Sequence, residues 1–160
     1  MKYIVKKILI SSGWYEGRNT DISEYMEWYA GEGYVPPDTV KRFLREFGGL
    51  KITIPLEVYL PNWLKRTKQP ENAKYCSDII ITTNPIDNGY EHEFIEKYNA
   101  HYKASLYPVG VSTSIPDIFM DSEGTFYAMY GDIGKKAGAS FEEYLIKNIN
   151  DDIGWLEQVY

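Results

Sequence analysis

The sequence predicts an α+β fold in which helices pack around a central, largely antiparallel sheet. Within residues 106–130, successive side chains form two alternating sets along three consecutive stretches, as expected for the two faces of three strands in a meander. The turn between the last two stretches is also recognisable, because Gly124 can adopt the positive φ of a three-residue hairpin loop and Asp121 can bond the backbone where the turn begins. Apolar residues at helical spacing recur through the rest of the chain. A chain of 160 residues is expected to form one domain, residues 1–160.

The first 33 residues predict two helices. The first should bury one apolar stripe, formed by Met1, Ile4, Val5 and Ile8. Gly13 is placed to end this helix in a left-handed cap, after which Trp14 can fold back on the stripe. The second helix is expected to start at Asp21, with Glu24 as its partner in a capping box. Its buried face is then Ile22, Tyr25, Met26 and Tyr29, and Gly31 and Gly33 end it.

Residues 37–47 predict the clearest helix, because prolines open it and Asp38 complements the positive end of its dipole. Its core face is Val40, Phe43, Leu44 and Phe47, with Arg42 and Arg45 on the solvent side and Gly48 and Gly49 at its end. Residues 50–54 alternate as a strand that Pro55 closes, and residues 79–81 form a second short apolar run. Between them, residues 56–77 show no period and predict a long connection.

Two further helices follow. The first is signalled by Asn88 ahead of Glu91, and its shared face is Tyr90, Phe94, Ile95, Tyr98 and Tyr102. The last helix opens with a capping box from Ser140 to Glu143, and its buried side is Phe141, Leu145 and Ile149.

The composition favours a soluble, cytoplasmic protein. The single cysteine, Cys76, excludes an intrachain disulfide and suits a reducing compartment. No run of about 20 apolar residues is present to span a membrane. A net charge of −6 repels phosphate backbones, so nucleic-acid binding is not expected. The acidic surface is either that of an ordinary cytoplasmic domain or a surface for a basic protein partner.

The sequence contains no recognisable catalytic or metal-binding constellation. His92 and His101 are nine positions apart on one expected helix and would lie on opposite faces, so they cannot share a metal ion. Cys76 lacks the local signature of a nucleophile and fits better as a small hydrophobe. Asp121, Glu123 and Asp132 are candidate carboxylates for acid–base chemistry. Asp121 and Glu123 lie at the expected turn, where they fit better as turn-forming and solvent-exposed residues. We therefore expect no enzyme, no metal and no cofactor.

The aromatic residues point to binding. They make up 16% of the chain, and 15 of them are tyrosines, which offer contact area with a hydrogen-bonding tip. In the connection at residues 56–77 the candidate partner-binding anchors are Tyr59, Trp63 and Tyr75, because no periodicity explains them there. The alternative is that these rings only hold the connection against the body of the protein.

Three segments together resemble one family. They are Gly-Trp-Tyr-Glu-Gly-Arg at residues 13–18 leading to Asp21, Phe-Leu-Arg-Glu-Phe-Gly-Gly-Leu at residues 43–50, and Leu-Tyr-Pro-Val-Gly at residues 106–110 with Asp-Ser-Glu-Gly at residues 121–124 and Tyr127. Their order and spacing are similar to those of the SUKH superfamily, and specifically of its third bacterial group of immunity proteins, over roughly residues 1–150. The first segment is the distinctive one, and residues 56–77 follow no family pattern.

The resemblance implies an α+β fold without catalysis. It implies a cytoplasmic antidote that binds and neutralises the toxin domain of a polymorphic secreted toxin, often a nuclease or a deaminase. Together with the acidic charge, it leads us to expect a basic toxin domain as the partner and a monomeric protein. The family motif is expected to be structural at Gly13, Trp14, Gly17, Arg18, Gly48, Gly49, Pro108, Gly110 and Gly124. The alternatives are a scaffold or regulatory binding module of the same superfamily, and a small-molecule hydrolase.

Overall fold

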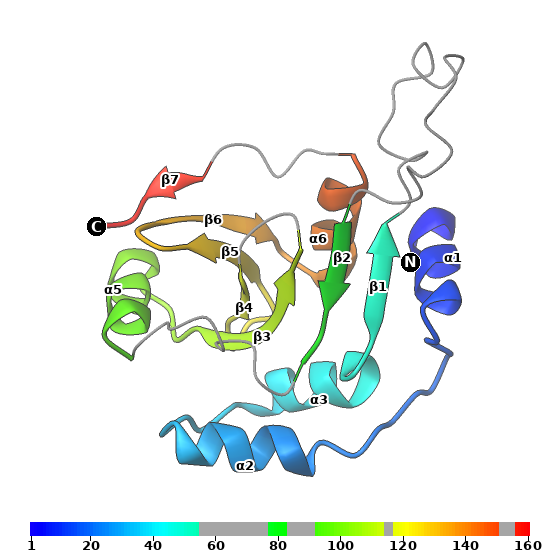
Figure 1. Cartoon of the computed structure of the whole chain (residues 1–160), viewed down its shortest axis with the longest axis horizontal. Helices are drawn as coiled ribbons and strands as arrows, with labels where there is room; N and C mark the ends of the chain where they lie inside the picture. The colour runs from blue at the N-terminus through cyan, green and yellow to red at the C-terminus, as the bar shows by residue number, and fades with distance from the viewer. Residues whose placement is uncertain (55–76, 83–91, 114–116, 151–155) are drawn as a thin grey trace.

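The computed structural model describes residues 1–54, 77–82, 92–113, 117–150 and 156–160. Within these residues the helices are α1 (Tyr3–Ser11), α2 (Ser23–Gly31), α3 (Asp38–Phe47), α5 (His92–Tyr102) and α6 (Phe141–Ile149). The strands are β1 (Lys51–Ile54), β2 (Ser77–Ile80), β3 (Tyr107–Ser112), β4 (Asp117–Met120), β5 (Phe126–Tyr130), β6 (Ile133–Gly138) and β7 (Glu157–Gln158). They form one antiparallel sheet in the order β1-β2-β3-β4-β5-β6-β7 (Figure 1). The α+β meander predicted from the sequence is confirmed.

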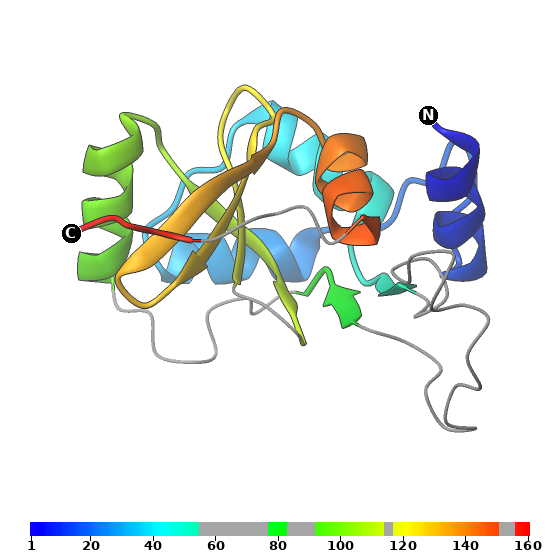
Figure 2. The ribbon, with the colours of Figure 1, turned by 90° about the horizontal axis from the view of Figure 1, so that it is seen from above.

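Helices cover both faces of the middle strands. Alternate residues of β4 and β5 separate into two clusters, so that Ile118, Met120, Phe126 and Ala128 join the main core, whereas Phe119, Tyr127 and Met129 pack with α5. Figure 2 shows α5 on one side of these strands and α3 and α6 on the other. Because both faces are covered, β4 is buried along its whole length, and its apolar residues Ile118, Phe119 and Met120 alternate between the two clusters.

The hairpin turn between β4 and β5 is built as its sequence predicts. Gly124 has a φ of +88°, and Asp121 Oδ1 accepts the N–H groups of Glu123 and Thr125 at 2.9 Å each. Asp121 Oδ2 accepts the Tyr127 hydroxyl at 2.9 Å. Burial, followed by this hydrogen bond to Asp121, raises the pKa of the Tyr127 phenol, so the hydroxyl stays protonated and able to donate.

The core faces of α3 and α6 are also confirmed. The α3 residues named above as its core face are buried, and Arg42 and Arg45 are exposed. At the start of α6, Ser140 Oγ accepts the Glu143 N–H at 3.2 Å and the Glu143 carboxylate accepts the Ala139 N–H at 2.9 Å. In a standard capping box this carboxylate would accept the N–H of the cap residue, Ser140. Here it accepts the N–H of the residue before the cap. In α5, Ile95 and Tyr98 are buried, while Asn88 and Tyr90 lie outside the described residues.

Two helix predictions at the N-terminus are wrong in detail. The buried stripe of α1 is Val5, Ile8 and Leu9, whereas Met1 is 56% exposed and Ile4 37%. Two overlapping stripes fit the helical period, and the one containing Leu9 faces the core. The capping box at α2 does not form, because Ile22 occupies the cap position and is buried. Asp21 instead accepts the N–H and hydroxyl of Ser23.

Strands β6 and β7 were not predicted from the sequence. β6 contains Gly134, Lys135 and Lys136, which have little intrinsic preference for a strand. Its pairing with β5 along residues 126–130 imposes the extended conformation. β7 has only two residues and continues the sheet beside β6, where Ile133 pairs with Gln158.

No helix among the described residues is long and apolar enough to cross a membrane.

Candidate functional site

The C-terminal end of α3 is capped by the segment that joins α1 to α2. A helix leaves the carbonyls of its last turn without helical partners. Arg18 Nη1 donates to the Glu46 carbonyl at 2.6 Å, and Nη2 donates to the Gly48 carbonyl at 2.7 Å. The Thr20 N–H donates to the Arg45 carbonyl at 2.9 Å. The Arg18 guanidinium therefore lies at the negative end of the α3 dipole and ties the α1–α2 connection to α3.

Trp14 lies beside the same end of α3. Its ring is 7% exposed and belongs to the main core, and Nε1 donates to Glu46 Oε1 at 3.1 Å. The turn that directs Trp14 inward is a helix cap, in which the Trp14 N–H donates to the Leu9 carbonyl and the Gly13 N–H donates to the Ile10 carbonyl. This pair of bonds is the Schellman arrangement, and it requires the left-handed φ of +93° that Gly13 adopts.

The two glycines after α3 bring its end close to α2. A Cβ atom on Gly48 would lie 2.4 Å from the Leu44 carbonyl oxygen, so no larger residue fits without a backbone shift. The Gly49 N–H donates both to the Ile81 carbonyl and to the Tyr25 hydroxyl, each at 2.9 Å. The Tyr25 hydroxyl in turn donates to the Ile81 carbonyl at 3.1 Å. Burial raises the pKa of Tyr25, which keeps this donor protonated.

The remaining motif positions lie on β3 and in the α1–α2 connection. The carbonyl of Pro108 accepts the buried Tyr29 hydroxyl, whose pKa is raised by burial. Gly110 lies against β2, where a Cβ atom would be 2.6 Å from the Ile80 carbonyl oxygen. Gly17 has a φ of +78° two residues after Tyr15 and turns the connection toward Arg18. Gly17 therefore lies at a turn, Gly110 at a close approach between β3 and β2, and Pro108 accepts a hydrogen bond from the buried Tyr29.

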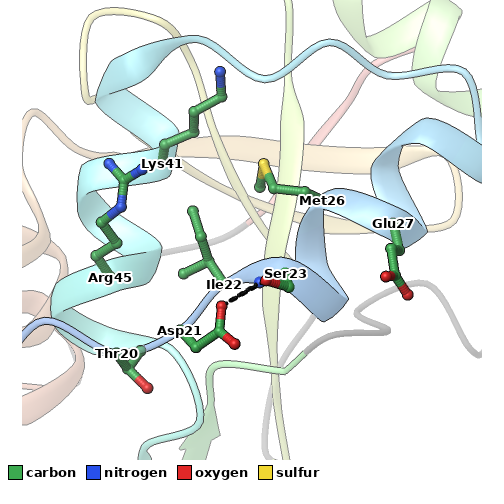
Figure 3. Close-up of a pocket in the computed structure, with 8 residues that line it drawn as sticks. All are labelled: Thr20, Asp21, Ile22, Ser23, Met26, Glu27, Lys41 and Arg45. Carbon is green, nitrogen blue, oxygen red and sulfur yellow. Dashed lines mark hydrogen bonds between the residues drawn. The ribbon is translucent and has the colours of Figure 1, made fainter.

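An open hollow lies between the start of α2 and the side of α3. It has a volume of about 720 Å³. Lys41 and Arg45 project along its α3 side, and Ile22, which caps α2, and Met26 of α2 point into the space between the helices (Figure 3). Ile22 is buried and Met26 is half-buried, so they form an apolar floor. The hollow thus has a cationic wall above an apolar floor.

The two cations of this wall are one helical turn apart. Lys41 Nζ is 3.8 Å from an oxygen of Asp38, a pair in which the carboxylate is almost fully exposed and which contributes little to stability. The Arg45 guanidinium makes no hydrogen bond or ion pair within the described part of the chain. A carboxylate from a partner could therefore approach Arg45 without displacing any of the residues that the structure describes.

The opposite rim of the hollow is acidic. Asp21 and Glu27 line it, and the carboxylate of Glu27 is directed away from α3 (Figure 3). Asp21 Oδ1 accepts the Ser23 hydroxyl at 2.6 Å and the Ser23 N–H at 2.9 Å. These two bonds, the hydroxyl bond first, lower the pKa of Asp21, so its carboxylate is charged near neutral pH.

Negative charge is concentrated around α2. Residues 19–40 contain five acidic residues and no basic residue, so this segment holds five of the six net negative charges of the chain. The five are Asp21, Glu24, Glu27, Glu32 and Asp38, and all are exposed. In Figure 1, α2 lies along the outer edge of the molecule. Val35, which follows α2, is 83% exposed and adds an apolar side chain to this edge. We call residues 19–40 the acidic edge.

The other residues singled out from the sequence are dispersed or undescribed. Tyr59, Trp63, Tyr75 and Cys76 lie outside the described residues. Asp121 is part of a turn at one end of β5, and Asp132 lies in the turn at the other end, so they do not form a carboxylate pair. His101 is exposed, and no group of three possible metal ligands occurs among residues that the structure describes.

Sequence reasoning missed both the acidic edge and the hollow. The run of 22 residues without a basic side chain was visible in the sequence, and a count of charges by segment would have found it. The hollow could not be found in this way, because its walls come from residues 20–27 and 41–45, which the tertiary structure brings together, for example through the bond from the Thr20 N–H to the Arg45 carbonyl.

The described residues define an α+β protein built on an antiparallel meander, with a charged and open surface around α2. The chain matches the family model of the SUKH-3 immunity proteins over residues 1–150, and it belongs to that family. The resemblance seen in the sequence is thereby confirmed. Family membership supports the role of an immunity protein and implies a cognate toxin as its partner. Comparison with curated proteins and with solved structures gives no significant match.

Proposed function

We propose that this protein neutralises its cognate toxin in the cytoplasm by binding it directly, and that the toxin surface it meets is basic. The observation that carries this proposal is the acidic edge, where five exposed carboxylates occur without a compensating cation in the same segment. Such a concentration of charge accelerates encounter with a basic partner and disfavours acidic ones. Val35 and the half-buried Trp28 supply apolar area beside the charges.

The acidic edge also favours a class of toxin. An enzyme that acts on nucleic acid needs a cationic surface for the phosphate backbone. An acidic inhibitor can cover that surface and exclude the substrate by occupying it. We therefore propose a toxin domain of the nuclease or nucleic-acid deaminase type, inhibited as a one-to-one complex without any catalytic step by the immunity protein.

The first experiment is coexpression with the toxin domain encoded by the neighbouring gene. The protein is expected to restore growth and to copurify with the toxin. Association should slow as salt increases, because screening weakens the attraction between the two surfaces. Restored growth without a complex, or association that does not depend on salt, would contradict this proposal.

A matched pair of variants tests the acidic edge itself. Glu24→Lys combined with Glu32→Lys reverses two charges within the edge. Glu16→Lys combined with Glu123→Lys makes the same change in net charge at exposed positions outside it. The first pair is expected to lower the association rate by about tenfold and the control pair by clearly less. Equal effects would mean that only net charge matters and that the edge is not the contact surface.

The aromatic anchors proposed from the sequence need a separate test. Tyr59, Trp63 and Tyr75 belong to the segment with no family pattern, and interface energy often concentrates in Trp and Tyr side chains. We expect Trp63→Ala to reduce rescue while circular dichroism shows a folded protein. Full rescue by that folded variant would mean that the ring is not an anchor.

A further inference from the structure

The hollow between α2 and α3 combines features that fit a particular kind of protein segment. Its α3 wall carries Lys41 and Arg45, and its floor is formed by Ile22 and Met26 (Figure 3). We infer that this hollow receives a segment of the toxin in which a carboxylate lies next to an apolar side chain. The inference rests on the proposed function and specifies where on the chain, and by what chemistry, the toxin is held.

The positive charge of the α3 wall favours a carboxylate there, whereas Asp21 and Glu27 on the opposite rim favour cations of the partner beside it. Among the described residues, the guanidinium of Arg45 has no partner, and Lys41 is held only by a long contact to an exposed carboxylate. A carboxylate placed between these two cations would form charge-assisted hydrogen bonds, and Arg45 can bind it with two donors. An apolar neighbour of that carboxylate would cover Met26 and remove its exposed surface from water.

The hollow is also held in shape before binding. Arg18 donates to the carbonyls of Glu46 and Gly48 at the end of α3, and the Thr20 N–H donates to that of Arg45, so the wall at residues 20–21 is fixed to the end of α3. Asp21 is fixed in turn by its two bonds to Ser23. A site that needs no ordering on binding loses less conformational entropy to its partner.

The cationic wall of the hollow lies beside the acidic edge, so this surface carries both positive and negative charge. A purely basic partner surface would be attracted to the edge but repelled by Lys41 and Arg45. A partner with a carboxylate at the hollow and cations around it would be attracted by the acidic edge and also by Lys41 and Arg45. Like-charge repulsion against wrong registers is a recognised source of specificity, so the hollow would determine which basic protein is accepted.

The test compares two charge reversals on the same helix. Arg45→Glu alters the hollow, and Arg42→Glu makes the same change in charge at an exposed position of α3 that does not line it. The probe is the toxin domain encoded by the neighbouring gene, inactivated at its catalytic residue, and the measurement is the Kd by calorimetry. If long-range attraction to a basic toxin were the only effect, both reversals would tighten binding. The inference predicts that Arg45→Glu raises Kd by about tenfold or more, whereas Arg42→Glu leaves it unchanged or lowers it.

A more conservative substitution of Arg45 separates an effect on binding from a defect in folding. Arg45→Gln removes the charge while keeping a side chain of similar length, and it should raise Kd by an intermediate amount with an unchanged melting temperature. Equal Kd values for Arg45→Glu and Arg42→Glu would overturn the inference while leaving direct toxin binding intact. Failure of the wild-type protein to bind the toxin domain would overturn the proposed function and this inference together.

Discussion

Replacing Arg18 with alanine should destabilise the protein by about 2 to 3 kcal/mol, because it removes the cap of α3. Each hydrogen bond from a charged donor contributes roughly 1.5 to 3 kcal/mol when it is shielded from water. Arg18 makes two, at 2.6 and 2.7 Å, to the carbonyls of Glu46 and Gly48. Two such bonds would sum to about 3 to 6 kcal/mol. The side chain is only half-buried, so water partly replaces these bonds and the expected loss falls to about 2 to 3 kcal/mol.

Arg18→Lys should recover only part of the loss. An ammonium group keeps the positive charge at the negative end of the helix dipole, a favourable interaction of about 0.3 to 1 kcal/mol. It cannot place two fixed donors on two carbonyls as the planar guanidinium does. We therefore expect Arg18→Lys to lie between the wild type and Arg18→Ala in its free energy of unfolding, and nearer to Arg18→Ala.

Urea unfolding followed by circular dichroism measures these differences. The midpoint should shift while the slope stays constant, which indicates a change in stability alone. For a protein of this size the expected loss corresponds to about 4 to 12 °C in melting temperature. Arg42→Ala, which removes an exposed arginine from the same helix, should stay within about 0.5 kcal/mol of the wild type. If Arg18→Ala also stayed within that margin, or if both variants lost the same amount, the capping role of Arg18 would be refuted.

Three further predictions concern the core and the sheet. Trp14→Ala should cost about 3 to 5 kcal/mol, because it empties a buried ring site, and an unchanged melting temperature would contradict this. Gly110→Ala should cost about 1 to 3 kcal/mol by chemical denaturation, since its Cβ would lie 2.6 Å from the Ile80 carbonyl oxygen; full stability would mean that β2 and β3 separate without strain. Burial tends to raise the pKa of Asp78, but hydrogen bonds led by that from Lys51 Nζ, which lies 2.8 Å away, outweigh burial and lower the pKa below 3.8. Asp78→Asn should therefore be less stable than the wild type near neutral pH. The difference in free energy of unfolding between the two proteins should shrink as pH falls from about 4 through the lowered pKa. A difference that stays constant between about pH 7 and pH 3 would exclude the ion pair as its cause.

The parts of the fold that are determined by residues adjacent in the sequence were predictable. The hairpin at Gly124 and the helix α3 carry their own turn and cap residues, and each forms as expected. The α1 stripe was assigned wrongly because two overlapping stripes have the same period, and only packing against the core selects the one with Leu9. β6 was missed because its extended backbone comes from pairing with β5 instead of from residues such as Lys135 and Lys136.

The candidate site was predictable only in part. The motif pointed to Trp14 and Arg18 as structural residues, but their shared partner, the end of α3, is 28 residues or more away along the chain. No periodicity relates positions so far apart. Arg45 was expected to be no more than a solvent-exposed residue, and its position at the hollow follows from the placement of the start of α2 beside α3. Local signals give the elements, whereas the surface between elements requires the tertiary structure.

The order of strands in the sheet has a consequence for how the protein is made. Because the spatial order is the same as the order along the chain, each strand pairs with one that has already left the ribosome when it appears. The Arg18 cap of α3 likewise needs only the first 48 residues. Contacts between distant parts of the chain form late, such as the ion pair between the Met1 amino group and Glu142 on α6. Folding can therefore keep pace with synthesis, with few strand edges left waiting for a distant partner.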